Sequence, residues 1–152
     1  MQEKVKRIFE SAKEKFIAVE SEFDLRVVLE FVDKDSYTEW AQRQKVTQII
    51  IENGHANNAG ELIEKLPFAN FRGSNGTHVI IAYIPAIENA IRGESEQDAQ
   101  LFIDGALIHE LKHATVGTVL SGEEEVLDFV ERNFPLHDRV LQRLQEKLFK
   151  KP

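Results

Sequence analysis

Residues 97–116 read QDAQLFIDGALIHELKHATV, and this stretch decides the organisation of the chain. Its apolar side chains return at helical intervals but cover nearly the whole circumference. They are Leu101, Phe102, Ile103, Ala106, Leu107, Ile108 and Leu111. A helix that is apolar all round is normally enclosed by the rest of its protein. We therefore expect a central, buried helix here, with the other elements packed around it.

Among the polar side chains of this stretch, His109, Glu110 and His113 lie within five positions of one another. Histidines four residues apart leave the same helix face about one turn apart, close enough to bind one tetrahedral metal ion. Glu110 turns toward the open side of such a site, where it can take a proton from a water held by the metal. Two surface histidines can share this spacing by chance, but burying them without a partner is costly. The pattern therefore favours a Zn²⁺ site.

A third ligand is expected on the acidic segment that follows. A histidine six residues after His113 would complete one known pattern, but that position is Val119. Glu124 is the favoured ligand, because Asp128 stands four residues later and could accept a hydrogen bond from a ligand histidine. The alternatives are Glu123, Glu125 and Glu131.

The path of the chain after His113 bears on this choice. A helix that ran straight to Leu120 and then turned tightly would bring Glu131 toward the histidines. A helix that ends at Gly117 instead leaves a connection that can swing the next helix back over the site.

The remaining segments predict a helix, three short strands and then more helices. Helical periods run through 2–20 and 136–150, and a strand period runs through 24–32. Further strands are expected over 45–52 and 77–85, ended by Asn53-Gly54 and by Pro85. The other expected pieces before the buried helix are a helix over 36–44 capped by Ser36 or Asp35, a helical piece at 59–65 followed by a loop to Gly76, and helical turns at 86–93. After it we expect a turn at Ser121-Gly122 and a helix from Glu123 that Pro135 closes. This order predicts an α+β fold, and 152 residues suit a single domain over 1–152.

Composition excludes several classes of function. The chain has no cysteine, which excludes disulfides, cysteine-ligated zinc and thiol catalysis. Its formal net charge of −7 argues against a nucleic-acid partner. The sequence has no signal-peptide core and no apolar stretch long enough to span a bilayer. We therefore expect a cytoplasmic protein without a membrane partner.

HELKHA followed by an acidic helix with Glu-x-x-x-Asp resembles the gluzincin class of HExxH zinc metallopeptidases (zincins). In size, the chain resembles the minimal single-domain members of that class. The resemblance covers roughly residues 77–134. It implies a zincin-like fold in which His109, His113 and Glu124 bind zinc and Glu110 is the catalytic base. It also implies that the strand at 77–85 is the edge strand that pairs with an extended peptide. Lys112 is a departure, because these families usually have an uncharged residue there.

The function expected from these features is hydrolysis of peptide bonds by a zinc-activated water, with a peptide or protein as substrate. His137 is a candidate donor to the developing oxyanion, although a surface histidine is the simpler interpretation. The alternative function is a zincin-like zinc-binding domain with a non-catalytic binding or regulatory role. A third interpretation is a metal-free structural helix.

Overall fold

The structure is a computed structural model that describes residues 1–24, 26–72, 77–116 and 119–149. The elements in these ranges are α1 (Gln2–Val19), β1 (Val27–Phe31), α2 (Lys34–Gln42), α3 (Lys45–Glu52), α4 (Ala59–Ile63), β2 (Phe68–Arg72), β3 (His78–Ala82), α5 (Ile84–Ile91), α6 (Glu96–Val116), α7 (Val119–Asn133) and α8 (Pro135–Phe149). The expected α+β class is confirmed. None of the helices in the described ranges combines the length and the apolarity that a membrane span requires.

The three strands form a mixed sheet in the order β1-β3-β2. β1 runs parallel to β3, and β2 runs antiparallel to it, so that Leu29 and Asn70 lie on either side of Ile80. All five residues of β3 are buried. The strand expected over 77–85 is confirmed for 78–82, but it ends before Pro85, which lies in the first turn of α5 (Ile84–Ile91), and its expected place at an edge is wrong. Strands on both sides take up the main-chain groups of β3, and β2 is an edge instead.

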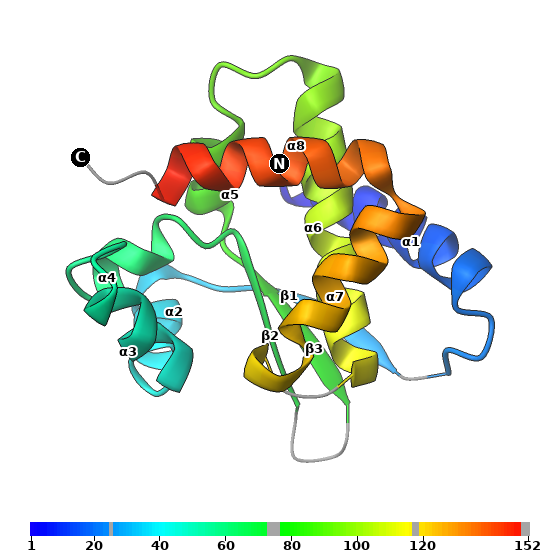
Figure 1. Ribbon diagram of the computed structural model, residues 1–152. Coiled ribbons are helices and arrows are strands. Elements are labelled where there is room, and N and C mark those ends of the chain that lie inside the picture. Colours follow the sequence, from blue (N-terminus) through cyan, green and yellow to red (C-terminus); the bar gives the residue numbers. More distant parts are fainter. Residues whose placement is uncertain (25, 73–76, 117–118, 150–152) are drawn as a thin grey trace.

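Helices cover both faces of this sheet (Figure 1). Phe68 and Ile80 on one face belong to the main core, which α1, α6, α7 and α8 complete. Ala69 and Ile81 on the other face pack against α2 and α4. The strands thus alternate between two apolar environments, as side chains on a pleated sheet do.

α6 lies at the centre of the main core, which confirms the expected buried helix. Its start is capped by Ser95, whose Oγ accepts a hydrogen bond from the Asp98 N–H at 3.1 Å. α6 packs against α1, α7, α8 and β2. Gly105 allows α8 to approach closely, because a Cβ at that position would lie 2.7 Å from the Leu141 Cδ1. The surroundings of α6 therefore hold the HExxH segment rigidly.

The segment 45–52, expected as a strand, is the helix α3. Its isoleucines favour a strand locally, but β-propensity is expressed only where a neighbouring strand is available. The three-stranded sheet does not include this segment, and α3 packs instead against α2 and α4. The expected stop is confirmed, since Gly54 has φ +78 and the His55 N–H reaches back to the Ile50 carbonyl at 3.2 Å.

Three other expectations on local structure are wrong. The segment 68–72, expected within a loop, is the strand β2. The cap of α2 is Asp33, whose Oδ1 accepts a hydrogen bond from the Ser36 N–H at 2.8 Å, rather than Ser36 or Asp35. Ser121-Gly122 is part of α7, which begins at Val119. A Cβ on Gly122 would lie 2.6 Å from the Val116 Cγ2, so glycine serves close packing of α7 on the end of α6 there.

Candidate metal centre

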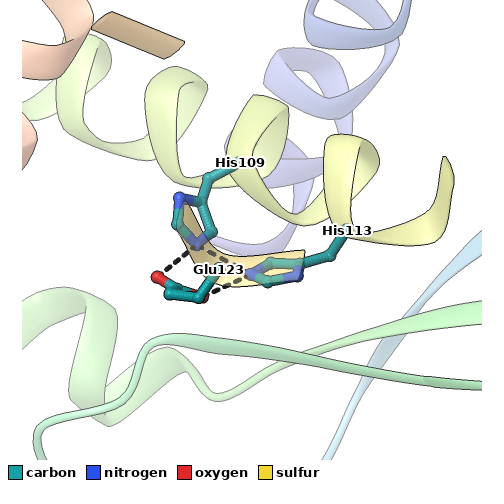
Figure 2. A group of neighbouring side chains, drawn as sticks. All are labelled: His109, His113 and Glu123. Atoms are coloured by element: carbon teal, nitrogen blue, oxygen red, sulfur yellow. Dashed lines mark hydrogen bonds and ion pairs between the residues drawn. The ribbon is translucent and has the colours of Figure 1, made fainter. Parts of the chain in front are cut away.

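His109 and His113 leave the same side of α6, and their side chains converge on a carboxylate from α7 (Figure 2). The two Nε2 atoms are 3.2 Å apart. Glu123 places its Oε2 2.7 Å from the His113 Nε2 and its Oε1 3.6 Å from the His109 Nε2. We call these three residues the His–Glu cluster. The i, i+4 spacing of the two histidines thus brings their side chains together, as expected from the sequence.

The dimensions of the His–Glu cluster fit a tetrahedral metal ion. Ligand atoms at about 2.0–2.2 Å from a tetrahedral Zn²⁺ lie about 3.3–3.6 Å from one another. Two separations in the cluster, 3.2 Å between the imidazole nitrogens and 3.6 Å from His109 to Glu123, are close to this edge length. The 3.6 Å separation involves the Glu123 Oε1, whereas the other carboxylate oxygen, Oε2, lies 2.7 Å from the His113 Nε2, which is a hydrogen-bond distance. Two imidazole nitrogens and one carboxylate oxygen are also a donor set that catalytic Zn²⁺ accepts.

The structure brings Glu123 to the histidines and not Glu124, the ligand favoured from the sequence. Because α7 begins at Val119 and not after Ser121-Gly122, the helix is already formed at position 123 and directs that side chain at α6. A step of one residue turns the side chain by about 100°. Glu124 is accordingly exposed, on an outer surface that it shares with Glu125, Asp128 and Glu131.

Asp128 does not serve the His–Glu cluster either. Its carboxylate is 60% exposed and accepts a hydrogen bond from the Arg132 Nη2 at 2.7 Å. Asp128 was expected to accept a hydrogen bond from the second ring nitrogen of a ligand histidine, but the buried Nδ1 of His113 has no hydrogen-bond partner among the described residues. The predicted hydrogen bond from a ligand histidine to Asp128 is therefore wrong, for the same reason of helix rotation that moves Glu124 away.

The residues of the His–Glu cluster affect one another's pKa values. Burial lowers the pKa of His109 to about 4, which keeps its imidazole neutral at pH 7 with a lone pair free to bind a metal. Burial also acts to lower the pKa of His113, but the hydrogen bond with Glu123 and the charges of Glu110 and Glu123 together outweigh burial and raise that pKa. At Glu123 burial acts to raise the pKa of the carboxyl, but the same hydrogen bond and the charges of His109 and His113 together lower it.

Glu110 lines the same pocket as the His–Glu cluster. Burial raises the pKa of Glu110 to about 7, although the charge of His113 and a hydrogen bond from Asn70 both act to lower it. The Asn70 amide donates that hydrogen bond to the Glu110 Oε2. A carboxylate with a pKa near neutrality can both accept and release a proton at pH 7.

Asn70 is a site residue that the sequence analysis missed. Phe68 and Asn70 are two residues apart on β2, so both side chains point to the face that α6 covers. A polar side chain on that face, beside a buried phenylalanine, needs a polar partner, and Glu110 supplies it. The alternation of Phe68, Ala69 and Asn70 is a usable signal, but only once the segment is recognised as a strand.

The pocket beside the His–Glu cluster has a volume of about 280 Å³ and is mainly apolar. α2, α3, β2 and the turn before β2 form one side, and α6 and α8 form the other. Its lining residues, apart from the polar groups already described, are Trp40, Ile50, Lys65, Leu66, Pro67, Phe68, Ala69, Phe102, Ala106, Leu141, Gln145, Leu148 and Phe149. A substrate side chain that enters this pocket would lie next to Glu110 and the histidines.

His137, the candidate oxyanion donor, does not line this pocket. Its Nε2 donates a hydrogen bond to the Asp104 Oδ2 at 2.8 Å, and its side chain is only 15% exposed. Lys15 from α1 donates a second hydrogen bond to the same carboxylate oxygen. His137 is thus neither a surface histidine nor a group at the candidate site. It joins α8 to α6 and α1 through a buried carboxylate.

We predict that Asp104→Asn destabilises the metal-free protein by about 1.5–3 kcal/mol at pH 7, the usual value of hydrogen bonds to a charged group. Burial acts to raise the pKa of Asp104, but the hydrogen bonds from His137 and Lys15 outweigh it and lower the pKa below 3.8. As pH falls, the unfolded chain binds this proton first, so the stabilisation declines below about pH 5. Urea unfolding of both proteins, with a chelator present, should therefore give a smaller difference at pH 4 than at pH 7. An equal difference at the two pH values contradicts the prediction.

Comparison of the chain with models of protein families, with curated proteins and with solved structures finds no match. The inference of function therefore depends on the residues and their geometry.

Proposed function

We propose that this chain is a zinc-dependent peptidase with a zincin-like fold. One observation carries the proposal: the Nε2 atoms of His109 and His113 and a carboxylate oxygen of Glu123 converge beside a pocket that Glu110 also lines. A chance HExxH sequence gives no reason for a carboxylate from a second helix to meet both imidazoles. Nor does it explain why a carboxylate of raised pKa should border the same pocket.

His109, His113 and Glu123 would hold the Zn²⁺, which leaves one tetrahedral position open, as in catalytic zinc sites with three protein ligands. Bound there, zinc would polarise a substrate carbonyl and lower the pKa of water toward neutrality. The protonation states of two of the proposed ligands suit a metal cation. Neutral His109 offers its lone pair without first losing a proton, and Glu123 brings one negative charge.

Glu110 is the proposed catalytic residue. Its carboxylate would accept a proton from the attacking water and then deliver that proton to the leaving amine. Asn70 keeps the carboxylate on the pocket side of α6 by its hydrogen bond to the Glu110 Oε2. Because its pKa is raised to about 7, Glu110 can act in both directions near neutral pH.

A peptide is the substrate that best suits the surroundings of the site. β2 pairs with β3 on one side only, among the described residues, and it borders the pocket through residues 68–70. An extended peptide could pair with the free side of β2 through its main chain and place an apolar side chain in the pocket. The net charge of −7 makes a nucleic acid an unsuitable partner.

The second candidate function is zinc-dependent binding without hydrolysis. The last turn of α8 favours it, because Leu148 and Phe149 border the pocket and narrow the space for a substrate. The His55 Nδ1 lies 3.3 Å from the Phe149 carbonyl oxygen and holds this turn against the segment that follows α3.

Digestion of a broad peptide library, with zinc and with a chelator, tests the peptidase proposal. We expect cleavage that disappears with the chelator, returns with added zinc, and occurs next to large apolar side chains. A protein that keeps its zinc but shows no metal-dependent cleavage contradicts the peptidase proposal and favours the binding role.

A further inference from the structure

Lys112 lies between Leu111 and His113 in the HExxH motif. Its side chain packs into the core and does not join the His–Glu cluster. The residue is only 8% exposed. Its Nζ donates a hydrogen bond to the Glu20 Oε1 at 2.5 Å, and Glu20 directly follows the end of α1. The buried ammonium is therefore paired with a carboxylate at the end of α1.

The same ammonium also contacts α7, the helix that carries Glu123. The Lys112 Nζ is 4.6 Å from the centroid of the Phe129 ring, a cation–π distance. Phe129 in turn packs edge-on against Phe16 of α1, with ring centroids 5.6 Å apart. Lys112 thus connects α1, α6 and α7 at one point, which we call the Lys112 junction (Glu20, Lys112 and Phe129).

The junction lies where it can determine the position of Glu123. Phe129 is six residues after Glu123, about 9 Å along α7. One end of this stretch contacts His113 through Glu123, and the other contacts Lys112 through Phe129. A tilt or rotation of α7 on α6 would disturb both contacts together, so a fixed Phe129 restricts where the Glu123 carboxylate can lie.

Stability alone does not call for a lysine at this position. A buried charge must be stripped of water, and replacing buried ion pairs by well-packed apolar residues is often neutral or stabilising. Methionine at position 112 could fill the same space beside Phe129. What methionine cannot do is bind a carboxylate of α1 and a ring of α7 in one defined geometry.

We propose that Lys112, held by Glu20, is a positioning residue that sets α7 on α6 so that Glu123 completes the metal site. This inference rests on the proposed zinc site, and it explains why a charged residue stands at position 112.

Zinc affinity of the purified chain tests this role without a substrate. We expect Lys112→Met to weaken zinc binding about 10–100-fold, the usual effect of residues that orient metal ligands. Lys13→Met is the matched control, because the Lys13 Nζ also lies over a ring, 4.7 Å from that of Phe9, and pairs with Glu10 at 3.1 Å, but only within α1. Its zinc affinity should equal that of the parent.

A double-mutant cycle separates positioning from a general effect on the fold. In a Glu123→Gln background, Lys112→Met should change zinc affinity by less than about twofold, because the carboxylate that it positions is gone. If Lys112→Met alone has no effect, or the same effect in both backgrounds, the inference is wrong.

If Lys112→Met does not fold, Phe129→Leu provides a second test, because it keeps an apolar side chain but removes the ring. This variant should show the same loss of zinc affinity and the same dependence on Glu123. If the parent binds no zinc, the zinc proposal itself fails and this inference fails with it.

Discussion

Glu123→Ala should weaken zinc binding by more than the ~100-fold that loss of an outer-shell partner costs, whereas Glu124→Ala should bind zinc as the parent does. The two carboxylates are adjacent in sequence, and they carry the same charge. Only Glu123 approaches the histidines, at 2.7 Å from the His113 Nε2 and 3.6 Å from the His109 Nε2. Glu124 lies on the exposed face of α7.

This pair of variants is a sharp test because it isolates position from charge. Competition with a chromophoric chelator gives both zinc affinities, and circular dichroism establishes that both variants are folded. An effect limited to Glu124→Ala would mean that α7 is rotated by one residue from the arrangement described here. Equal, small effects for both would mean that neither carboxylate is a ligand.

Glu110→Gln should keep zinc but lose peptide hydrolysis by about 10²–10⁴-fold, the usual contribution of a general base. Glutamine has nearly the same shape and can still contact Asn70, so the pocket should be preserved. It cannot accept a proton from water or return one to the leaving amine. The His–Glu cluster does not include position 110, and zinc content should therefore remain that of the parent.

The assay is the zinc-dependent cleavage of the peptides identified in the library digest, followed as kcat/KM. Glu125→Gln is the matched control, since Glu125 is an exposed carboxylate that does not line the pocket. Its kcat/KM should equal that of the parent. Activity of Glu110→Gln within tenfold of the parent, with zinc bound, would rule out Glu110 as the base.

The parts of the fold that could be predicted are those decided by local pattern. α6 carries apolar side chains all round, so its buried position follows from its own composition. The approach of His109 to His113 follows from the geometry of a single helix. These are short-range relations, and the structure agrees with them.

The errors arose where a distant part of the chain decides the local conformation. The residues of 45–52 suit either a strand or a short helix, and only the packing of this segment against α2 and α4, away from the sheet, decides for the helix. The segment 68–72 is a strand because it pairs with β3. Turn-forming residues on either side of it predict a loop when the sequence alone is considered.

The third ligand and Asn70 show the same limitation within the site. Three consecutive carboxylates at 123–125 point in directions about 100° apart, so an error in the start of α7 changes which one meets the histidines. The contact of Asn70 with Glu110 joins residues 40 positions apart on a strand and a helix. Neither relation can be deduced before the packing of α7 and β2 on α6 is known.

Zinc K-edge absorption of the loaded protein shows whether His109, His113 and Glu123 form a zinc site. We expect about one zinc per chain, with two imidazole nitrogens and a carboxylate oxygen at about 2.0–2.2 Å. Zinc retained without imidazole ligands, or no zinc retained after loading and dialysis, would contradict this expectation.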